Sequence, residues 1–297
     1  MNPEQKAYLS LHIAVLLFGF TAILGDVIQL AALPIVWWRL LITSLSLLFI
    51  INVIKLFRQT SGRRIALFAG IGVIVGLHWL TFYGAIKLSN ASITLVCMAT
   101  ASFFTSLIEP IILKQRFNWH EGVLGVIIVP AMVLIVSDLS PDLMWGIPVG
   151  LTSAFLAALF STLNKKYIHQ GKILRITYIE LTSALLFLTL LLPFFWQGEG
   201  MDFIRPVGMD WVYLLILGVL CTTLAFVLSL NALKEISAFA SSLTINLEPV
   251  YGIALAAVLL GDHQELSPSF YWGVGIILLA VFSYPYINRI LRKRQLS

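Results

Sequence analysis

The stretch AFASSLTINLEPVYGIALAAVLL, residues 238–260, shows what kind of fold to expect from the whole chain. At about 1.5 Å of rise per residue it is long enough for a helix to cross a hydrocarbon core about 30 Å thick, and Glu248 then lies about 15 Å in. A carboxylate at that depth is unfavourable unless the protein solvates it. Pro249 cannot donate a backbone hydrogen bond, so the carbonyl of Ile245 loses its helical partner. The stretch therefore predicts a transmembrane helix that is interrupted near its middle.

The composition extends this interpretation to the whole chain. Of the 297 residues 59% are hydrophobic and 11% charged, and the mean hydropathy is +0.95, whereas soluble domains carry about 25% charged residues. No alternation of polar and apolar residues favours a barrel, so we expect an all-α polytopic membrane protein. The first apolar run lacks a small-residue cleavage pattern and is expected to stay as a helix. Ten spans are predicted, at residues 8–25, 34–54, 66–86, 92–113, 121–138, 146–164, 174–195, 210–230, 238–260 and 270–288.

The distribution of basic residues predicts the orientation of these spans. If the chain is threaded through the membrane from a cytoplasmic N-terminus, sixteen of the nineteen Lys and Arg residues fall on the cytoplasmic side. Only Lys87 and Arg205 fall on the other side, and Arg39 lies near the outer end of the second span. This asymmetry predicts an inner-membrane protein with both termini in the cytoplasm. The net charge of +5 thus reflects topology, and no nucleic-acid partner is expected.

The two halves of the chain share a spacing of residues. An offset of 148 places Gly70 on Gly218 and matches spans three to five with spans eight to ten, and an offset near 141 places Phe18 on Phe160. Because each half then holds five helices, an odd number, the second half enters the membrane from the opposite side. The sequence therefore predicts two inverted five-helix repeats, related by an axis in the membrane plane.

Polar residues cluster around the expected break. Asn246, Glu248 and Tyr251 lie beside Pro249, and broken helices are tolerated in membranes where they line water or substrate. These side chains are candidates for substrate binding or ion coupling, with Pro249 as the helix kink. The alternative is a packing kink, in which Asn246 and Glu248 bond to neighbouring helices.

His78 is a second candidate, near mid-depth in the third span and flanked by Trp79 and Tyr83. A neutral imidazole can donate to a substrate carboxylate or carry a proton, and the two aromatic residues can contribute to the same site. An interhelical hydrogen bond explains His78 equally well. Ser102 is a small residue in an apolar span, where close helix packing is the usual role and cavity lining the other.

Three further charged residues lie closer to the ends of spans and are interpreted as gate or boundary residues. Arg39 can reach the outer surface over about 7 Å, which favours anchoring at the interface over substrate contact. Its match in the second half, Glu180, lies near the cytoplasmic end of the seventh span. Glu109 lies near Lys114 and Arg116, and a salt bridge or a hydrated helix end accounts for it.

Motifs for catalysis and metal binding are not found in the sequence. There is no HExxH, no GxSxG and no phosphate-binding glycine loop, and no expected span contains a pair of acids at helical spacing. Cys97 and Cys221 lie within apolar runs, and neither has metal-ligand spacing around it. We expect neither a cofactor nor a metal, and the protein is not expected to be an enzyme.

With ten spans in two sets of five, and Leu247-Glu248-Pro249-Val250 leading to Leu259-Leu260-Gly261-Asp262, the chain resembles EamA-type bacterial members of the drug/metabolite transporter superfamily. The resemblance covers nearly the whole chain and places the repeats at residues 1–140 and 141–297. Asp262 stands where the family usually has Glu, and Ala101 stands at the proline register of the first repeat. The resemblance implies alternating access of a small molecule to a cavity between the halves, commonly for export of amino acids or related metabolites.

The leading hypothesis is a secondary transporter that exports a small polar or amphipathic metabolite, with an amino acid as the best guess. Its partners are then the small-molecule substrate, the lipid bilayer and, if transport is coupled through Glu248, protons. The alternative is a membrane-embedded enzyme that acts on a lipid or isoprenoid with Glu248 and His78 as acid and base. A channel or scaffold is disfavoured by the inverted repeat.

Overall fold

The fold is a bundle of helices, seen in a computed structural model that describes residues 1–135, 144–195, 200–248, 250–251 and 268–295. These residues contain no strand. The main helices are α1 (Pro3–Val27), α2 (Ala32–Leu48), α3 (Val53–Gln59), α4 (Gly62–Leu88), α5 (Ala91–Leu113), α6 (Trp119–Ile135), α7 (Gly146–Tyr167), α8 (Ile173–Phe195), α9 (Asp210–Gly218), α10 (Ala225–Glu235), α11 (Ala238–Ile245) and α13 (Pro268–Gln295). A π-helical segment, Val219–Leu224, joins α9 to α10.

The positions of these helices agree with the all-α prediction. Each of the ten expected ranges carries a described helix. Six spans in the described part of the chain are long and apolar enough to cross a membrane, or seven if the bent pair α2–α3 is counted as one. Helices α6 and α13 carry shorter apolar stretches. Parts of two expected spans, 121–138 and 238–260, lie outside the described residues, and so do Pro249 and Asp262. The number of ten membrane spans therefore stays a prediction.

The second expected span, 34–54, is wrong at its end. Helix α2 stops at Leu48, and α3 leaves it at an angle of 88°. The amide of Ile51 bonds back to the carbonyl of Leu47 (2.9 Å), and the Asn52 side chain then accepts from the amide of Lys55 (2.8 Å) as the N-cap of α3. An asparagine at a helix start satisfies an amide that has no helical partner, which favours a new helix over continuation of the old one.

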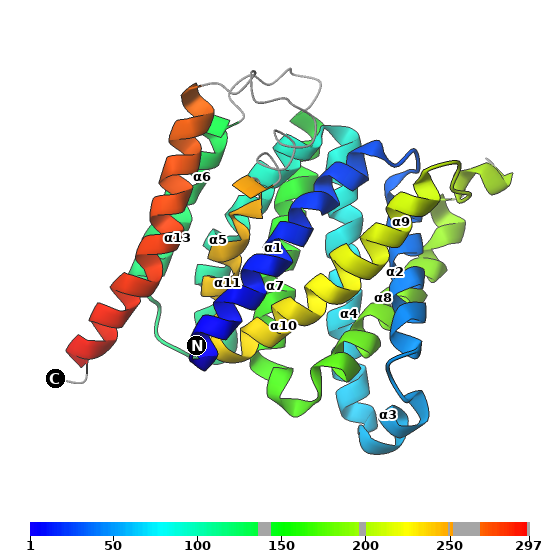
Figure 1. Ribbon diagram of the computed structural model, residues 1–297, viewed down its shortest axis with the longest axis horizontal. Helices are drawn as coiled ribbons and strands as arrows, with labels where there is room; N and C mark the ends of the chain where they lie inside the picture. Colours follow the sequence, from blue (N-terminus) through cyan, green and yellow to red (C-terminus); the bar gives the residue numbers. More distant parts are fainter. Residues whose placement is uncertain (136–143, 196–199, 249, 252–267, 296–297) are drawn as a thin grey trace.

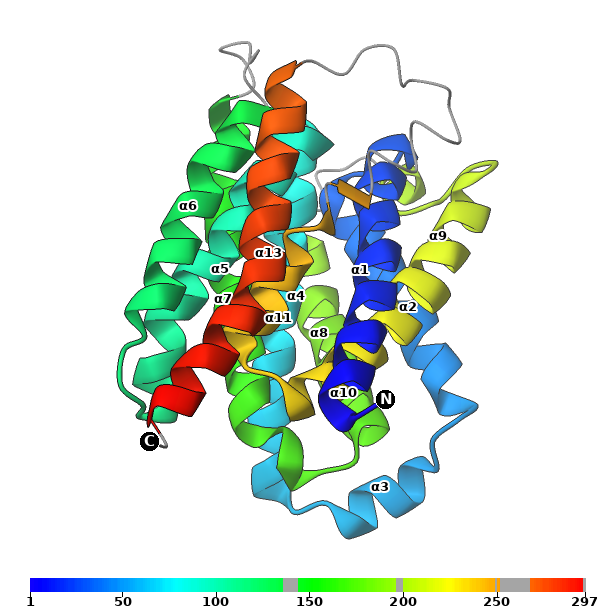
Figure 2. The ribbon, with the colours of Figure 1, turned by 60° about the vertical axis from the view of Figure 1, so that its left-hand side comes forward.

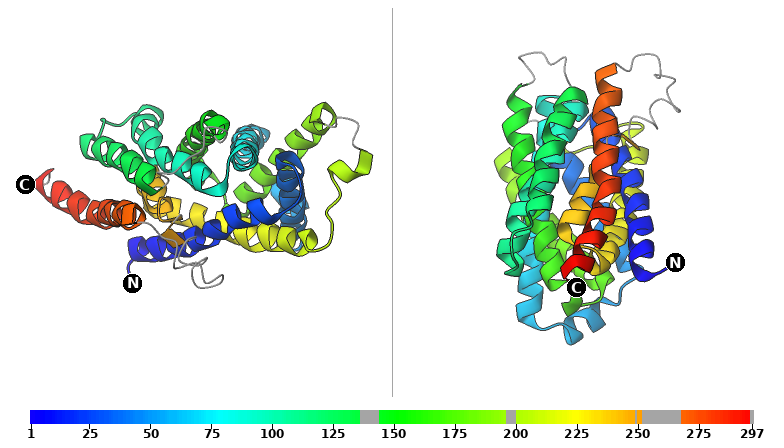
Figure 3. Two further views of the ribbon diagram at one scale, coloured as in Figure 1. Left: turned by 90° about the horizontal axis from the view of Figure 1, so that it is seen from above. Right: turned by 90° about the vertical axis from the view of Figure 1, so that its left-hand side faces the viewer.

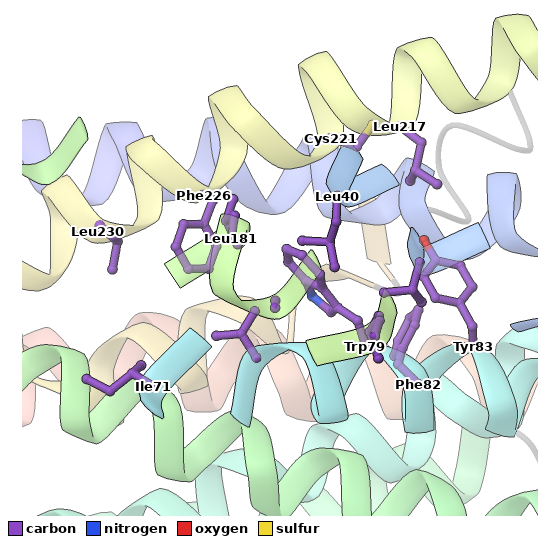
Figure 4. Packing of buried hydrophobic residues seen from close by; sticks show 14 of the residues in the cluster. Leu40, Ile71, Trp79, Phe82, Tyr83, Leu181, Leu217, Cys221, Phe226 and Leu230 are labelled. Carbon is purple, nitrogen blue, oxygen red and sulfur yellow. The ribbon is translucent and has the colours of Figure 1, made fainter. Parts of the chain in front are cut away.

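The bundle carries apolar side chains outside and many polar ones inside. Leu186, Leu190 and Phe194 of α8 are exposed, whereas Thr177 and Glu180 of the same helix are buried. Figure 4 shows the main apolar cluster, in which side chains from α2, α4, α8, α9 and α10 meet around Trp79. Exposed apolar side chains on a protein of this size are what lipid contact requires.

The helices form an elongated bundle, in which α6 and α13 pack side by side at one edge (Figures 1 and 3). Helix α5 packs on α7, α4 packs on α7 and α8, and α1 packs on α10. The start of α1 and the end of α13 lie at the same end of the bundle, where α3 also lies (Figure 2).

Helices α4 and α8 approach each other closely at Gly72. A Cβ atom added to Gly72 would lie 2.1 Å from the backbone oxygen of Glu180. Small residues let helix backbones come together in membranes, where dispersion forces and hydrogen bonds hold helices in contact. The contact therefore depends on glycine, and it fixes α8 against α4 at the level of the buried Glu180.

Candidate functional site

A cavity of about 100 Å³ lies within the bundle. Its walls come from α1, α2, α4 and α5 in the first half of the chain and from α7, α10 and α11 in the second. Among the described residues, five phenylalanine and tryptophan rings line it, and these belong to Phe18, Trp79, Phe82, Phe160 and Phe226. The polar lining side chains are those of Thr21, Arg39, His78, Ser161, Ser229, Ser242 and Glu248. The cavity thus combines apolar walls with a few polar groups, as small-molecule sites usually do.

Arg39 lines this cavity instead of reaching the outer surface, so the expectation that it anchors at the interface is wrong. Its side chain is 1% exposed, and its guanidinium carbon lies 3.9 Å from the centre of the Trp79 ring. The Nη1 group donates to the hydroxyl of Tyr83 at 3.1 Å. The face of the Trp79 ring and the Tyr83 hydroxyl thus solvate the buried guanidinium in place of water.

The π-helical segment supplies the remaining partners of Arg39. Its Nε donates to Thr222 Oγ1 at 2.5 Å, and its Nη2 lies 3.5 Å from the carbonyl oxygen of Cys221. The Thr222 hydroxyl itself donates to the carbonyl of Leu217, five residues back, at 2.6 Å. A π turn inserts one residue into an α-helix, and such turns are often found at functional sites. Sequence reasoning missed Thr222, because consecutive threonines in an apolar run do not reveal a π turn.

His78 of α4 is tied to α7. Its Nδ1 lies 3.0 Å from the carbonyl oxygen of Ser153, and the Ser153 hydroxyl donates to the carbonyl of His78 at 2.9 Å. The Ser153 hydroxyl oxygen also lies 2.9 Å from Nδ1, so one residue of α7 holds the imidazole through both its backbone and its side chain. The imidazole packs 5.3 Å from the Phe160 ring and lines the cavity. The interhelical bond and the cavity position, which the sequence left as alternatives, occur together.

Glu248 reaches the cavity from the turn after α11. The helix ends at Ile245, and the amide of Leu247 bonds to the carbonyl of Thr244 at 3.0 Å. Glu248 is 7% exposed and lines the same cavity as Arg39. In the described part of the chain no ion pair joins the two, so two ionisable side chains face one small space without contacting each other directly.

Four other candidates, namely Asn246, Ser102, Tyr83 and Tyr251, are not among the residues that line this cavity. Asn246 donates through Nδ2 to Ser102 Oγ at 3.1 Å, which joins α11 to α5. Tyr83 stands behind Arg39 as its hydrogen-bond acceptor. The hydroxyl of Tyr251 lies 2.8 Å from Nδ1 of His12 on α1. These residues position helices and charged groups and are not among those that face the cavity.

Glu109 has a different partner from the one expected. Its two carboxylate oxygens accept from the backbone amides of Ala238 (3.0 Å) and Phe239 (2.7 Å), at the start of α11. The first amides of a helix lack internal partners, and a carboxylate there also interacts favourably with the helix dipole. Glu109 of α5 thus caps a helix of the other half of the chain, and a salt bridge with Lys114 or Arg116 is not needed to explain it.

Glu180 is fully buried between α7 and α8. Its Oε2 accepts from Asn164 Nδ2 at 3.2 Å. The other oxygen of each side chain, Glu180 Oε1 and Asn164 Oδ1, has no hydrogen-bond partner among the described residues. Neither residue is among those that line the cavity. Within the described part of the chain, no group of three or more His, Cys, Asp or Glu side chains is placed to hold a metal ion.

Known proteins resemble this chain over nearly its full length. The model of the EamA-like transporter family matches residues 5–137 and 144–284. A Bacillus subtilis (strain 168) protein named uncharacterized transporter YetK is 20% identical over 279 residues, covering 89% of this chain and 83% of YetK. A solved crystal structure superposes with a TM-score of 0.75 at 15% identity, covering 97% of this chain and 99% of its own, which shows a shared fold. These matches give no support to a membrane-embedded enzyme. The chain belongs to the EamA-like transporter family of the drug/metabolite transporter superfamily and is a multi-pass membrane transporter.

Proposed function

We propose that this transporter exports an amino acid or a closely related zwitterion across the inner membrane by alternating access. The observation that carries the proposal is that two ionisable side chains of opposite type, Arg39 and Glu248, line one small cavity without an ion pair between them. A guanidinium matches a carboxylate in charge and geometry, and a carboxylate matches an ammonium. An α-amino acid carries both groups on one carbon, so a single small molecule can satisfy both residues.

The remaining walls favour an amphipathic substrate. Aromatic rings from α1, α4, α7 and α10 surround the charged groups and offer apolar contact to a side chain. A volume of about 100 Å³ exceeds that needed for one water severalfold but is below that of an engineered cavity that binds benzene, about 150 Å³. The site therefore suits a small metabolite better than a large drug-like molecule.

The packing of the helices supports two inverted five-helix repeats, at residues 1–140 and 141–297. The proposed repeats pair five helices of the first half with counterparts in the second, in the order α1 with α7, α2 with α8, α4 with α9–α10, α5 with α11 and α6 with α13. With this pairing, a contact between two helices recurs between their counterparts. Helix α2 packs on its counterpart α8, α5 on α11 and α6 on α13. Helix α4 packs on α7 and α8, and α9–α10 correspondingly packs on α1 and α2. An axis between the halves would place the cavity at their interface, where alternating access requires it.

The termini are proposed to be cytoplasmic. The start of α1 and the end of α13 share one end of the bundle, and sixteen of the nineteen basic residues are assigned to that side. Short loops rich in Lys and Arg stay in the cytoplasm. We assign Arg39, Glu109 and Glu180 as residues that connect helices whose relative positions change during alternating access. Arg39 also contacts the substrate.

The proposal predicts which parts of the substrate are recognised. In proteoliposomes, counterflow of a radiolabelled amino acid, chosen from a panel, should be inhibited by unlabelled amino acid. The amine that lacks its carboxylate and the acid that lacks its ammonium should each inhibit about 10–100-fold less well, since a hydrogen bond to a charged group contributes about 1.5–3 kcal/mol. Equal competition by either analogue contradicts the proposed recognition.

Two variants assign these groups to residues. Arg39→Gln should remove the preference for the carboxylate, and Glu248→Gln the preference for the ammonium. Glu235→Gln, which removes an exposed carboxylate outside the cavity, serves as the matched control and should retain both. If transport is driven by protons through Glu248, Glu248→Gln should also abolish accumulation driven by a pH gradient while exchange remains measurable. Unchanged gradient-driven uptake in this variant refutes coupling through Glu248.

A further inference from the structure

A second pocket, of about 240 Å³, lies at the end of the bundle that carries the termini. It is formed where the end of α3 and the start of α4 meet the α7–α8 connection and the first turns of α8. Its walls contain Arg64, His169, Lys172 and Arg175, and none of the described residues that line it carries a carboxylate. Three side chains that are cationic at neutral pH therefore surround one recess without a balancing carboxylate among its described lining residues.

The two arginines are held in place by neutral acceptors. Arg175 Nη2 donates to Gln59 Oε1 at 2.7 Å, and Arg64 Nη1 donates to the carbonyl oxygen of Gln170 at 3.3 Å. Each guanidinium has five N–H donors, and most of these have no hydrogen-bond partner in the part of the chain that the structure describes. Bonds to neutral groups orient the cations and leave their charge available, which is the arrangement that a phosphate group requires.

The adjoining helix places this pocket at the level of lipid headgroups. Helix α3 turns by 88° from α2, so it lies along the membrane surface if α2 crosses the membrane (Figures 1 and 2). Ile54 and Phe57, three residues apart on α3, are 75% and 56% exposed. Short interfacial helices bury such side chains at the boundary between headgroups and acyl chains. Gln59 at the end of α3 lines the pocket, so the pocket opens at the same depth.

We propose that this pocket binds the phosphate of an anionic phospholipid headgroup, with Arg64 and Arg175 as its principal ligands and Lys172 as a third cation. The apolar face of α3 would place the acyl chains beside the helix, and the recess would receive the headgroup. A bound headgroup would bridge α4 of the first half and α8 of the second. The site is separate from the substrate cavity, and it does not depend on which substrate is transported.

The test compares two double variants that each remove two positive charges. Arg64→Gln/Arg175→Gln alters the pocket, whereas Arg58→Gln/Arg63→Gln removes two exposed arginines that do not line it. Binding of phosphatidylglycerol and phosphatidylcholine to the purified full-length protein in detergent is measured by native mass spectrometry. Circular dichroism and gel filtration confirm that both variants are folded.

The wild-type protein should prefer phosphatidylglycerol over phosphatidylcholine. The control double variant should lose only the diffuse attraction, about fivefold for each charge near the surface. The pocket double variant should lose at least about tenfold more than the control, because it also loses directed hydrogen bonds to a charged group. Equal losses in the two variants, or no preference for the anionic lipid in the wild type, overturn the proposal. Saturation by inorganic phosphate alone at the same concentration would identify a free-anion site and would also overturn the lipid assignment.

Discussion

The close approach of α4 and α8 at Gly72 yields a quantitative prediction for Gly72→Ala. The added Cβ would lie 2.1 Å from the Glu180 backbone oxygen, and contacts below 3.0 Å essentially never occur, so the helices have to separate locally by about 0.9 Å. Overpacking of this kind destabilises by about 1–3 kcal/mol. Strain on the Asn164–Glu180 hydrogen bond adds about 1 kcal/mol, and the higher helix propensity of alanine offsets about the same amount. The free energy of unfolding should fall by about 1–3 kcal/mol.

Gly70, two residues earlier on the same helix, provides the matched control. A Cβ atom added there meets nothing within 4 Å, so Gly70→Ala should be neutral or stabilising by about 0.4–1 kcal/mol. Both variants are compared by unfolding in mixed micelles with increasing sodium dodecyl sulfate, followed by circular dichroism. If Gly72→Ala is as stable as Gly70→Ala, the two helices are not in the close contact described above.

Three further variants test the surroundings of the cavity and the cap of α11. Arg39→Lys keeps the charge but loses the planar group stacked on Trp79, so apparent substrate affinity in counterflow should fall at least about tenfold. If the Arg39→Lys variant instead keeps the affinity of the wild type, the geometry of the guanidinium has no role in binding. Tyr83→Phe removes one acceptor from Arg39 and should weaken substrate affinity about fivefold with little loss of stability, and an unchanged KM would contradict this. Glu109→Ala leaves two amides of α11 unpaired, so it should lower the free energy of unfolding by about 1–3 kcal/mol. The control Glu235→Ala, at an exposed position, should change the free energy of unfolding by less than about 0.5 kcal/mol. Equal effects of the two variants would refute the capping role of Glu109.

The positions of the helices could be predicted from sequence because the length of an apolar run is tied to membrane thickness. The bend after α2 could not be found this way, since hydropathy stays high through residues 49–54 while the backbone turns. Asn52 was the available signal, because its side chain competes for backbone amides and favours a helix start. Hydropathy therefore predicts where the membrane-spanning helices lie, and helix-capping residues predict where the helix breaks between α2 and α3.

The surroundings of charged side chains were less predictable. The short distance from Arg39 to the end of its span predicts that it reaches the surface, yet its partners are Tyr83 and Thr222, which are 44 and 183 residues away in the sequence. Asn246 likewise donates a hydrogen bond to Ser102, which is 144 residues away in the sequence. Depth along one helix can be counted from sequence, but the direction a side chain faces depends on which helices pack against it. Polar candidates were therefore recognised, and their partners were not.

The cap that Glu109 forms on α11 also provides a natural reporter of conformation. The amide hydrogens of Ala238 and Phe239 are bonded to a side chain from another helix, so their protection from deuterium exchange depends on the contact between α5 and α11. In the alternating-access cycle proposed above, separation of the halves at this end would release both amides to solvent. Exchange at two backbone positions would then show which side of the membrane the transporter faces, without an attached label.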